Sequence, residues 1–364
     1  MIVVIADDFT GAAELAGISL RYGQVVELFL DSVTDSDAQV VVISADSRSL
    51  SKEEALKKIS AIVKQVTKLK PLLVYKKLDS VLRGYVADEL KVQMQETGFN
   101  KVIVLPANPS LGRTVVNGEY FVNEKRIKET SFVDDPEFPV HSSFVKEILN
   151  DEVEVLRHTD HLPASGIVVG EVSAVEDFDS WINKLDDSWL LAGAGDFFSV
   201  LMGKRFQHGP QQDYKTCLPH FYICGTAFEE RKQFIKELAF HHRYVVSLPE
   251  KVDEVWLDSV AEILRENNKL LLAVDESNEP ASVLRQKMAA MARTIIERNS
   301  IREIFIEGGS TAAAVLEDLN IKKLTPVNEL SRGVVRMKAG ELFLTVKPGS
   351  YELPGEIKRL YKPD

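Results

Sequence analysis

The chain has 364 residues, which is long for one hydrophobic core and favours two domains. Its composition, 45% hydrophobic and 27% charged, is typical of a folded globular protein and excludes a disordered chain. The net charge of −11 argues against broad binding to nucleic-acid phosphates, so an anionic ligand would need a local cationic pocket.

Targeting and redox features are sparse. No apolar stretch approaches the roughly 20 residues that cross a bilayer, and the first residues lack the basic start and cleavage site of an export signal. We therefore expect a cytoplasmic protein with no membrane partner. Cys217 and Cys224 lack metal-site spacing, and Cys224 lies in an apolar run where a buried thiol is expected.

In the first part of the chain, apolar strand-like runs alternate with helix-like segments, which predicts βαβ units and a mostly parallel sheet. The predicted strands lie at residues 2–6, 24–30, 38–44, 72–78 and 101–107. The stretch 51–69 predicts a helix, with Ser51 as its N-cap and Glu54 as the capping-box partner three residues later.

From residue 108 to 143 the pattern breaks into turn residues, with an Asn-Gly pair and two X-Pro steps. This segment predicts a hairpin and long loops. Strand-like segments return at 166–170 and 189–195, and the polar stretch 204–216 predicts a linker.

The rest of the chain predicts a second α/β unit, in which residues 282–300 form one of the helices. Its predicted strands lie at 220–225, 242–248, 269–275, 302–309 and 342–347. We predict an α/β protein with two domains, residues 1–210 and 211–364, that have mostly parallel sheets and an active-site cleft between them.

The segment ADDFTG follows the first predicted strand, at the end of a parallel sheet where ligands collect. One acid could cap the next helix, but two adjacent acids favour a functional role. Asp7 or Asp8 could act as a general base or hold Mg²⁺, while Thr10 and Gly11 offer a hydroxyl and backbone N–H groups to an anion.

Cations gather after two further strands of the first domain. KKLDSVLRG carries Lys77, Asp79, Ser80 and Arg83, and PANPSLGRT carries Gly112 and Arg113. Arginine grips a carboxylate or phosphate through paired hydrogen bonds, so these segments predict an anionic substrate. A solvated charge run with Asp79 as a helix cap, and ordinary turn chemistry around Gly112, are the structural alternatives.

Three small-residue turns follow strands of the second domain, and together they could line one nucleotide. The residues concerned are Thr226, Gly308, Gly309, Ser310, Thr311 and Gly349. Each alone could be an ordinary turn. The GGST segment matches neither the Walker A nor the GxGxxG pattern, and no GxSxG elbow supports a Ser-His-Asp hydrolase.

Taken together, ADDFTGA, KKLDSVLRG, PANPSLGRTVVNGEYFV, ICGTAF, EGGSTA and KPGSYE resemble the four-carbon acid sugar kinase family over the whole chain and in the same order. The resemblance implies an ATP- and Mg²⁺-dependent kinase that phosphorylates the terminal hydroxyl of threonate, erythronate or 3-oxo-tetronate. It also implies an amino-terminal domain that binds the acid sugar and a carboxyl-terminal domain that binds ATP.

Carried over by motif, the resemblance implies that Asp7, Asp8, Thr10, Lys77, Asp79, Ser80, Arg83, Gly112 and Arg113 belong to the acid-sugar side. In the same way it places Thr226, Gly308, Gly309, Ser310, Thr311 and Gly349 on the ATP side. Arg83, with Arg113 or Lys77, would grip the substrate carboxylate, and Asp7 or Asp8 would accept the proton of the attacking hydroxyl.

Some positions depart from the family pattern. DSVLRGY stands where DSTLRGN is usual, and the departures KPGSYELP and CGTAF lie on the ATP side. They motivate a rival hypothesis, a non-catalytic acid-binding or sensory protein on the same fold. The sequence leaves open the particular acid, any residues that hold a metal, which aspartate is the base, and the oligomeric state, a homodimer included.

Overall fold

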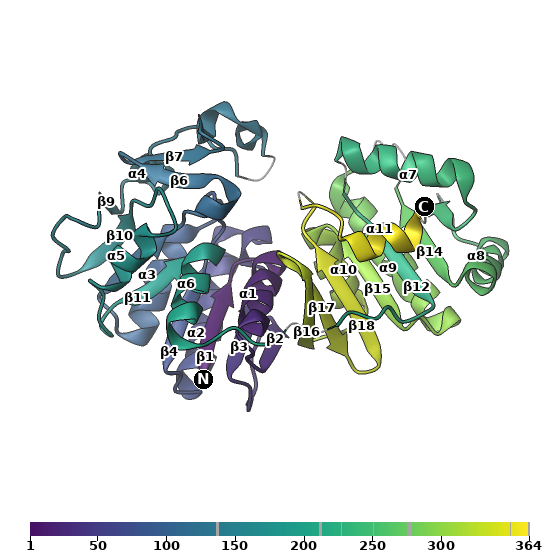
Figure 1. Cartoon of the computed structure of the whole chain (residues 1–364), viewed down its shortest axis with the longest axis horizontal. Coiled ribbons are helices and arrows are strands. Elements are labelled where there is room, and N and C mark those ends of the chain that lie inside the picture. Colours follow the sequence, from purple (N-terminus) through teal and green to yellow (C-terminus); the bar gives the residue numbers. More distant parts are fainter. Residues whose placement is uncertain are drawn as a thin grey trace. The chain divides into compact units, whose positions relative to one another are not determined.

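The computed structural model describes residues 1–135, 138–210, 213–226, 228–249, 251–274, 279–349 and 351–362. The chain divides into two compact units, Met1–Pro210 and Gln211–Asp364, which run from purple to teal and from teal to yellow in Figure 1. Helices and strands alternate in both units, which confirms the α/β class. The cleft between domains stays a prediction.

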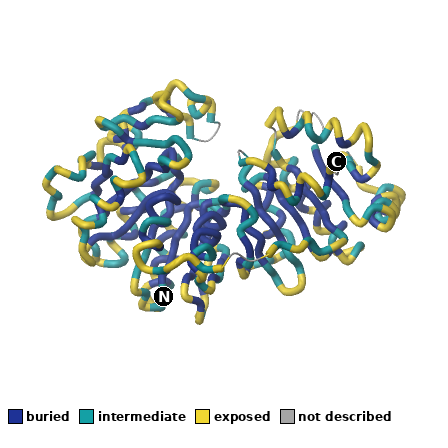
Figure 2. The backbone as a smooth tube through the Cα atoms, viewed as in Figure 1, coloured by how far each residue is buried: buried dark blue, intermediate teal, exposed yellow. Residues whose placement is uncertain are grey.

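The sheet of the first unit is parallel throughout, in the order β2-β3-β1-β4-β11-β5-β10-β9. Its strands are β1 (Ile2–Ala6), β2 (Val26–Leu30), β3 (Val40–Ser44), β4 (Leu73–Lys77), β5 (Lys101–Leu105), β9 (Glu154–Leu156), β10 (Gly166–Gly170) and β11 (Leu190–Gly193). Every residue of β1 and β3 is buried, as the dark tubes of Figure 2 show. Uninterrupted apolar strands of this kind need helices on both faces of the sheet.

The helices of this unit are α1 (Phe9–Arg21), α2 (Lys52–Lys68), α3 (Val86–Thr97), α4 (Val145–Ile148), α5 (Asp177–Ile182) and α6 (Gly195–Arg205). Successive side chains of a strand point to opposite faces. On β4, Lys76 pairs with Glu89 of α3, whereas Lys77 lies near Glu14 of α1. Helices α1 and α3 therefore cover opposite faces of the sheet.

Helix α2 begins as the sequence predicts. Ser51 is its N-cap, and the Ser51 and Glu54 side chains each pair with the backbone N–H of the other residue. Its buried face, which includes Ile59, packs against Val3 and Val41 of the sheet. The predicted capping box is confirmed.

We expect Ser51→Ala to destabilise the first unit by about 1 kcal/mol, because the backbone N–H of Glu54 at the start of α2 loses its side-chain acceptor. Urea unfolding followed by far-ultraviolet circular dichroism would measure the loss. Lys57→Ala, on the exposed face of the same helix, is the matched control. Equal stability of the two variants would contradict a capping contribution.

The predicted hairpin is present as a separate antiparallel sheet of β6 (Arg113–Val116), β7 (Glu119–Val122) and β8 (Lys125–Arg126). Asn117 and Gly118 connect β6 to β7, with φ angles of 50° and 76°. Two successive positive φ angles match the twist of a hairpin, and Asn-Gly accommodates them. Four short 3-10 helices complete the unit: η1 (Ser47–Ser49), η2 (Pro109–Leu111), η3 (Ile127–Glu129) and η4 (Ser131–Asp134).

The second unit has a mixed sheet in the order β13-β14-β12-β15-β18-β17-β16. Strands β13, β14, β12, β15 and β18 pair in parallel. Strand β17 pairs antiparallel with β18, and β16 pairs antiparallel with β17. The strands are β12 (His220–Cys224), β13 (Val245–Ser247), β14 (Lys269–Ala273), β15 (Glu303–Glu307), β16 (Lys323–Ser331), β17 (Val334–Ala339) and β18 (Leu342–Lys347). The helices are α7 (Glu229–His241), α8 (Glu254–Asn267), α9 (Ala281–Asn299), α10 (Gly309–Asp318) and α11 (Gly355–Tyr361).

The sequence did not predict β16 and β17. Proline is rare inside strands because it cannot donate to the ladder, and Pro326 lies inside β16, at a register shift.

In the predicted linker, helix α6 extends to Arg205, and the described residues 206–210 and 213–219 lie outside helices and strands. Residues Pro136, Glu137, Gln211, Gln212, Ala227, Asp275 and Ser350 of the predicted segments lie outside the described residues. Over the described part of the chain, none of the helices combines the length and apolar character that spanning a membrane requires.

Candidate active site

Asp7 and Asp8 follow β1 directly. Asp8 is the N-cap of α1: its Oδ1 accepts a hydrogen bond from the Gly11 N–H at 2.8 Å, and its Oδ2 accepts one from the Thr10 hydroxyl at 2.5 Å. A Cβ on Gly11 would come within 2.6 Å of Asp8 Oδ1 and 3.0 Å of Lys77 Nζ. One acid therefore has the structural role that the sequence allowed, and glycine is needed beside it.

Arg48 is the central cation of this site, and sequence reasoning missed it. Its guanidinium lies 3.5 Å from Asp7, 2.8 Å from Asp8 and 3.0 Å from Asp79. Strands β3 and β4 flank β1, so their carboxyl ends bring η1 and the Asp79 turn to the two aspartates. Arg48 follows a predicted strand by a few residues, as the recognised acids do, and this shared position was the available signal.

The two aspartates differ in their acidity. Burial and the charge of Asp8 raise the pKa of Asp7 to about 6 against the opposing effect of Arg48, and Asp7 Oδ1 has no hydrogen-bond partner among the described residues. Burial also opposes the ionisation of Asp8, but Arg48, Lys77 and its hydrogen bonds outweigh burial and hold the pKa of Asp8 below its usual range. Of the two carboxyl groups, Asp7 is thus the one whose pKa lies nearer neutrality.

The two lysines of the KKLDS segment are buried on different faces of the sheet. Lys76 Nζ lies 2.6 Å from Glu89 on the α3 side. Lys77 Nζ donates to the Leu78 carbonyl at 2.8 Å and lies 3.8 Å from Glu14. Only Lys77 lies on the α1 side, and its charge contributes to the low pKa of Asp8.

Asp79 is the most heavily bonded acid of the site. Arg83 approaches it with Nε at 3.0 Å and Nη2 at 2.9 Å, and the backbone N–H of Arg83 also donates to it at 3.1 Å. Burial opposes its ionisation, but Arg83 and Arg48 hold the pKa of Asp79 far below its usual range. Arg83 also pairs with Asp135 at 2.8 Å. The arginine expected to grip a substrate carboxylate is already bound by two carboxylates of the protein.

Arg113 lies at the start of β6 and contacts the Ser80 hydroxyl. Within the part of the chain that the structure describes, no ion pair joins Arg113 to a carboxylate. Tyr120 of the hairpin donates to the Ser80 carbonyl, so β7 packs over the same turn. Gly112 precedes Arg113 with φ of 66°, and a Cβ there would lie 2.1 Å from Asn123 Oδ1. Among the described residues, Arg113 is therefore a cation that lies beside Ser80 and forms no ion pair with an acid.

A second polar cluster at the same edge of the sheet also escaped prediction. Asp196, in the first turn of α6, accepts hydrogen bonds from the Ser110 N–H at 2.9 Å and from its hydroxyl at 2.6 Å. The Asp196 N–H donates to Asn108 Oδ1 at 2.8 Å. All three follow the strands β5 and β11, so the carboxyl edge of the sheet is polar along much of its length.

The predicted turns of the second unit lie beside one another. Cys224, Glu307 and Lys347 are in register at the ends of the adjacent strands β12, β15 and β18. Backbone hydrogen bonds from Gly225 to Glu307 and from Gly308 to Lys347 join the turns.

Close contacts fix these turns further. A Cβ on Gly225 would lie 1.9 Å from Thr311 Oγ1, and one on Gly349 would lie 2.9 Å from Thr226 Oγ1. Gly308 precedes α10 with φ of 110°, which glycine adopts readily. The structure thus assembles Thr226, Gly308, Gly309, Ser310, Thr311 and Gly349 at one edge of one sheet.

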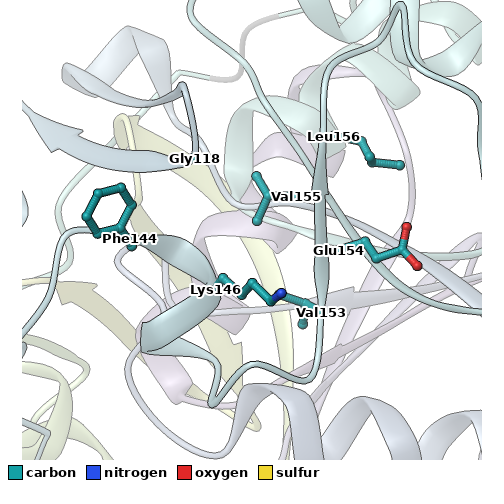
Figure 3. A pocket seen from close by; sticks show the side chains of 7 residues that line it. All are labelled: Gly118, Phe144, Lys146, Val153, Glu154, Val155 and Leu156. Atoms are coloured by element: carbon teal, nitrogen blue, oxygen red, sulfur yellow. The ribbon is translucent and has the colours of Figure 1, made fainter.

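A hollow elsewhere in the first unit contains none of the predicted site residues. It has a volume of about 370 Å³ and is lined by Gly118, Phe144, Lys146 and residues 153–156, shown in Figure 3.

Among the described residues, no group of three or more His, Cys, Asp and Glu side chains is arranged to hold a metal ion. Asp7, Asp8 and Asp79 surround the Arg48 guanidinium instead.

Comparison with known proteins assigns the two units. Residues 2–185 match the sugar-binding N-terminal domain model, and residues 250–351 match the nucleotide-binding C-terminal domain model. The D-threonate kinase of Salmonella typhimurium is 27% identical over 86% of this chain and 85% of its own length. The 3-oxo-tetronate kinase of Pseudomonas fluorescens is 23% identical over 95% and 93%.

Solved structures support the same fold. A Salmonella typhimurium protein described as a putative tRNA synthase superposes with a TM-score of 0.79 at 20% identity and covers 96% of both chains. A Haemophilus influenzae protein superposes with a TM-score of 0.76 at 16% identity and covers 98% of both chains.

A sugar-binding domain followed by a nucleotide-binding domain defines a small-molecule kinase, a phosphotransferase with an alcohol group as acceptor. The chain belongs to the four-carbon acid sugar kinase family. The resemblance seen in the sequence motifs is confirmed.

Proposed function

We propose that this kinase uses Mg·ATP to phosphorylate the terminal hydroxyl of a four-carbon acid sugar, such as threonate, erythronate or 3-oxo-tetronate, to the 4-phosphate. The names of the D-threonate and 3-oxo-tetronate kinase relatives support this substrate class. The observation that carries the chemistry is Asp7, a buried carboxyl beside Arg48 and Asp8 with one oxygen that has no hydrogen-bond partner among the described residues.

Asp7 is our candidate for the general base. A pKa raised to about 6 keeps the carboxyl ionised at neutral pH and still able to hold a proton. In the reaction, the substrate hydroxyl would pass its proton to Asp7 while its oxygen forms a bond to the γ-phosphorus of ATP, and the bond from that phosphorus to ADP would break. Asp8, which caps α1 and stays ionised, would hold Arg48 in place.

Arg113 is our candidate for the cation that binds the substrate carboxylate. The resemblance favoured Arg83, but Asp79 and Asp135 already balance the charge of that side chain. Among the described side chains, the Arg113 guanidinium donates a hydrogen bond to a neutral hydroxyl, that of Ser80. A guanidinium without an acidic partner can offer two parallel hydrogen bonds to a carboxylate. Lys77, which lies near Asp8 and Gly11, would add positive charge to the site.

The second domain, residues 211–364, would bind the triphosphate at the turns after β12, β15 and β18. Helix α10 begins at Gly309 with no acidic residue in its first turn, which suits an anion at its N-terminus. Mg²⁺ would arrive on the phosphates of ATP, where it would neutralise charge during phosphoryl transfer.

The test is ADP release with Mg·ATP and a panel of four-carbon acids, combined with calorimetric titration of nucleotide and acid separately. We expect ATP binding, and turnover with at least one acid that yields a 4-phosphate by product analysis. Acid binding without ATP binding would instead support a non-catalytic acid-binding protein. ATP binding without turnover of any acid would contradict the proposed substrate class.

A further inference from the structure

Lys347 ends β18 directly before the predicted nucleotide-binding turn at Gly349, and its side chain is fully buried. An ammonium group is rarely buried unless it is paired and hydrogen-bonded. The proposed reaction does not use this lysine directly. Its contacts show what the charge holds in place.

Three acceptors surround the Lys347 Nζ. It lies 2.9 Å from Glu307 Oε1, and it donates to the carbonyl oxygens of Pro348 at 2.8 Å and Gly349 at 3.2 Å. An ammonium group has three N–H donors, so this set matches its full capacity. Two of the three contacts are hydrogen bonds to the backbone of the turn. The third joins Lys347 to Glu307 at the end of the adjacent strand β15.

The Glu307 carboxylate has further partners besides Lys347. Glu307 is fully buried and also pairs with Arg231 at 2.9 Å, while the Tyr222 hydroxyl donates to it. Among the described residues of this cluster, two cations thus face one carboxylate, so the cluster of Arg231, Glu307 and Lys347 carries a net positive charge. A net positive charge there favours the binding of a triphosphate.

We propose that Lys347 is a positioning residue for the nucleotide. Its ammonium draws the carbonyl groups of Pro348 and Gly349 toward Glu307, away from the phosphates, and so fixes the Gly349 turn in its binding conformation. This inference rests on the proposed binding of ATP by the second domain. It differs from a purely structural role because the loss of Lys347 should free the two carbonyl oxygens.

The test compares Lys347→Met with Arg231→Met. Both variants remove one cation from Glu307, but only the first removes contacts to the turn. Hydrogen bonds to charged groups justify an expected rise of about tenfold or more in the Kd of Mg·ATP for Lys347→Met, measured by calorimetry. For Arg231→Met we expect a rise of less than about threefold. The KM for the acid sugar should stay unchanged while the KM for ATP rises.

A triple variant, Lys347→Met with Glu307→Gln and Arg231→Met, keeps the test available if the single variant fails to fold, since it leaves no unpaired buried charge among these three residues. It should show the same loss of ATP affinity. Equal ATP affinity of the Lys347 and Arg231 single variants, or wild-type affinity in the triple variant, would overturn the inference and leave the proposed kinase function intact. Absence of ATP binding by the wild-type protein would overturn both.

Discussion

Asp7→Asn is expected to lower kcat by about 10²- to 10⁴-fold, the usual contribution of a general base, while the chain stays folded. The amide keeps the shape of the carboxyl but cannot accept the proton of the attacking hydroxyl. Steady-state kinetics with the best acid of the panel would measure the change. Asp35→Asn, an exposed substitution in the same unit, is the control. Wild-type turnover in Asp7→Asn would exclude Asp7 as the base.

The pH profile gives a second measure of Asp7. Because burial raises the pKa of Asp7 to about 6, kcat/KM of the wild-type enzyme should rise with pH and level off above about pH 6. Below that pH the base is protonated and cannot accept a proton. Asp7→Asn should lose this rise in its residual activity. A wild-type profile that is flat between pH 5 and 7 would contradict the assignment.

The contribution of Asp7 to folding stability should fall as pH rises, whereas kcat/KM should rise. A raised pKa means that the folded protein binds more protons than the unfolded chain between pH 4 and 6, so the contribution of Asp7 to stability falls as pH rises through that window. A shift from 3.8 to about 6 corresponds to about 3 kcal/mol. We therefore expect Asp7→Asn to be more stable than wild type at pH 7.5 and nearly equal at pH 4, as measured by urea unfolding.

Arg48→Met is expected to destabilise the first unit by about 3–5 kcal/mol, the usual cost of leaving buried charge uncompensated. Three carboxylates, those of Asp7, Asp8 and Asp79, face the guanidinium and would lose their common partner. For a unit of this size the melting temperature should fall by roughly 6–20 °C. Calorimetry or thermal circular dichroism would measure the loss.

Two comparisons sharpen the Arg48 prediction. Arg157→Met removes an exposed arginine that pairs with Asp160, and it should cost less than about 0.5 kcal/mol. The deficit of Arg48→Met should shrink as pH falls toward 5, because the unpaired carboxylates can then take up protons. A deficit that is independent of pH would show that lost packing, not charge, causes it.

The fold features that the sequence predicted correctly are local. Ser51 and Glu54 are three residues apart, Asn117 and Gly118 are adjacent, and strand-length apolar runs need no partner to be recognised. Arg48 could not be identified in this way, because its importance depends on the strand order β3-β1-β4, which places distant segments side by side. The pairing of Arg83 with Asp135 had the same limit, since Asp135 lies 52 residues away.

The adjacent lysines of β4 have a consequence for the tolerance of this strand to insertion and deletion. A shift of the strand by one residue would turn each lysine to the opposite face of the sheet, since alternate positions face opposite layers. Only one of the two ammonium groups could then reach the acid of the other, so the second ammonium and either Glu14 or Glu89 would be buried without a partner. Register-shifted pairing of β4 during folding is thereby disfavoured. Insertions or deletions within β4 should destabilise the fold, whereas the exposed connection near Asp35 should tolerate them.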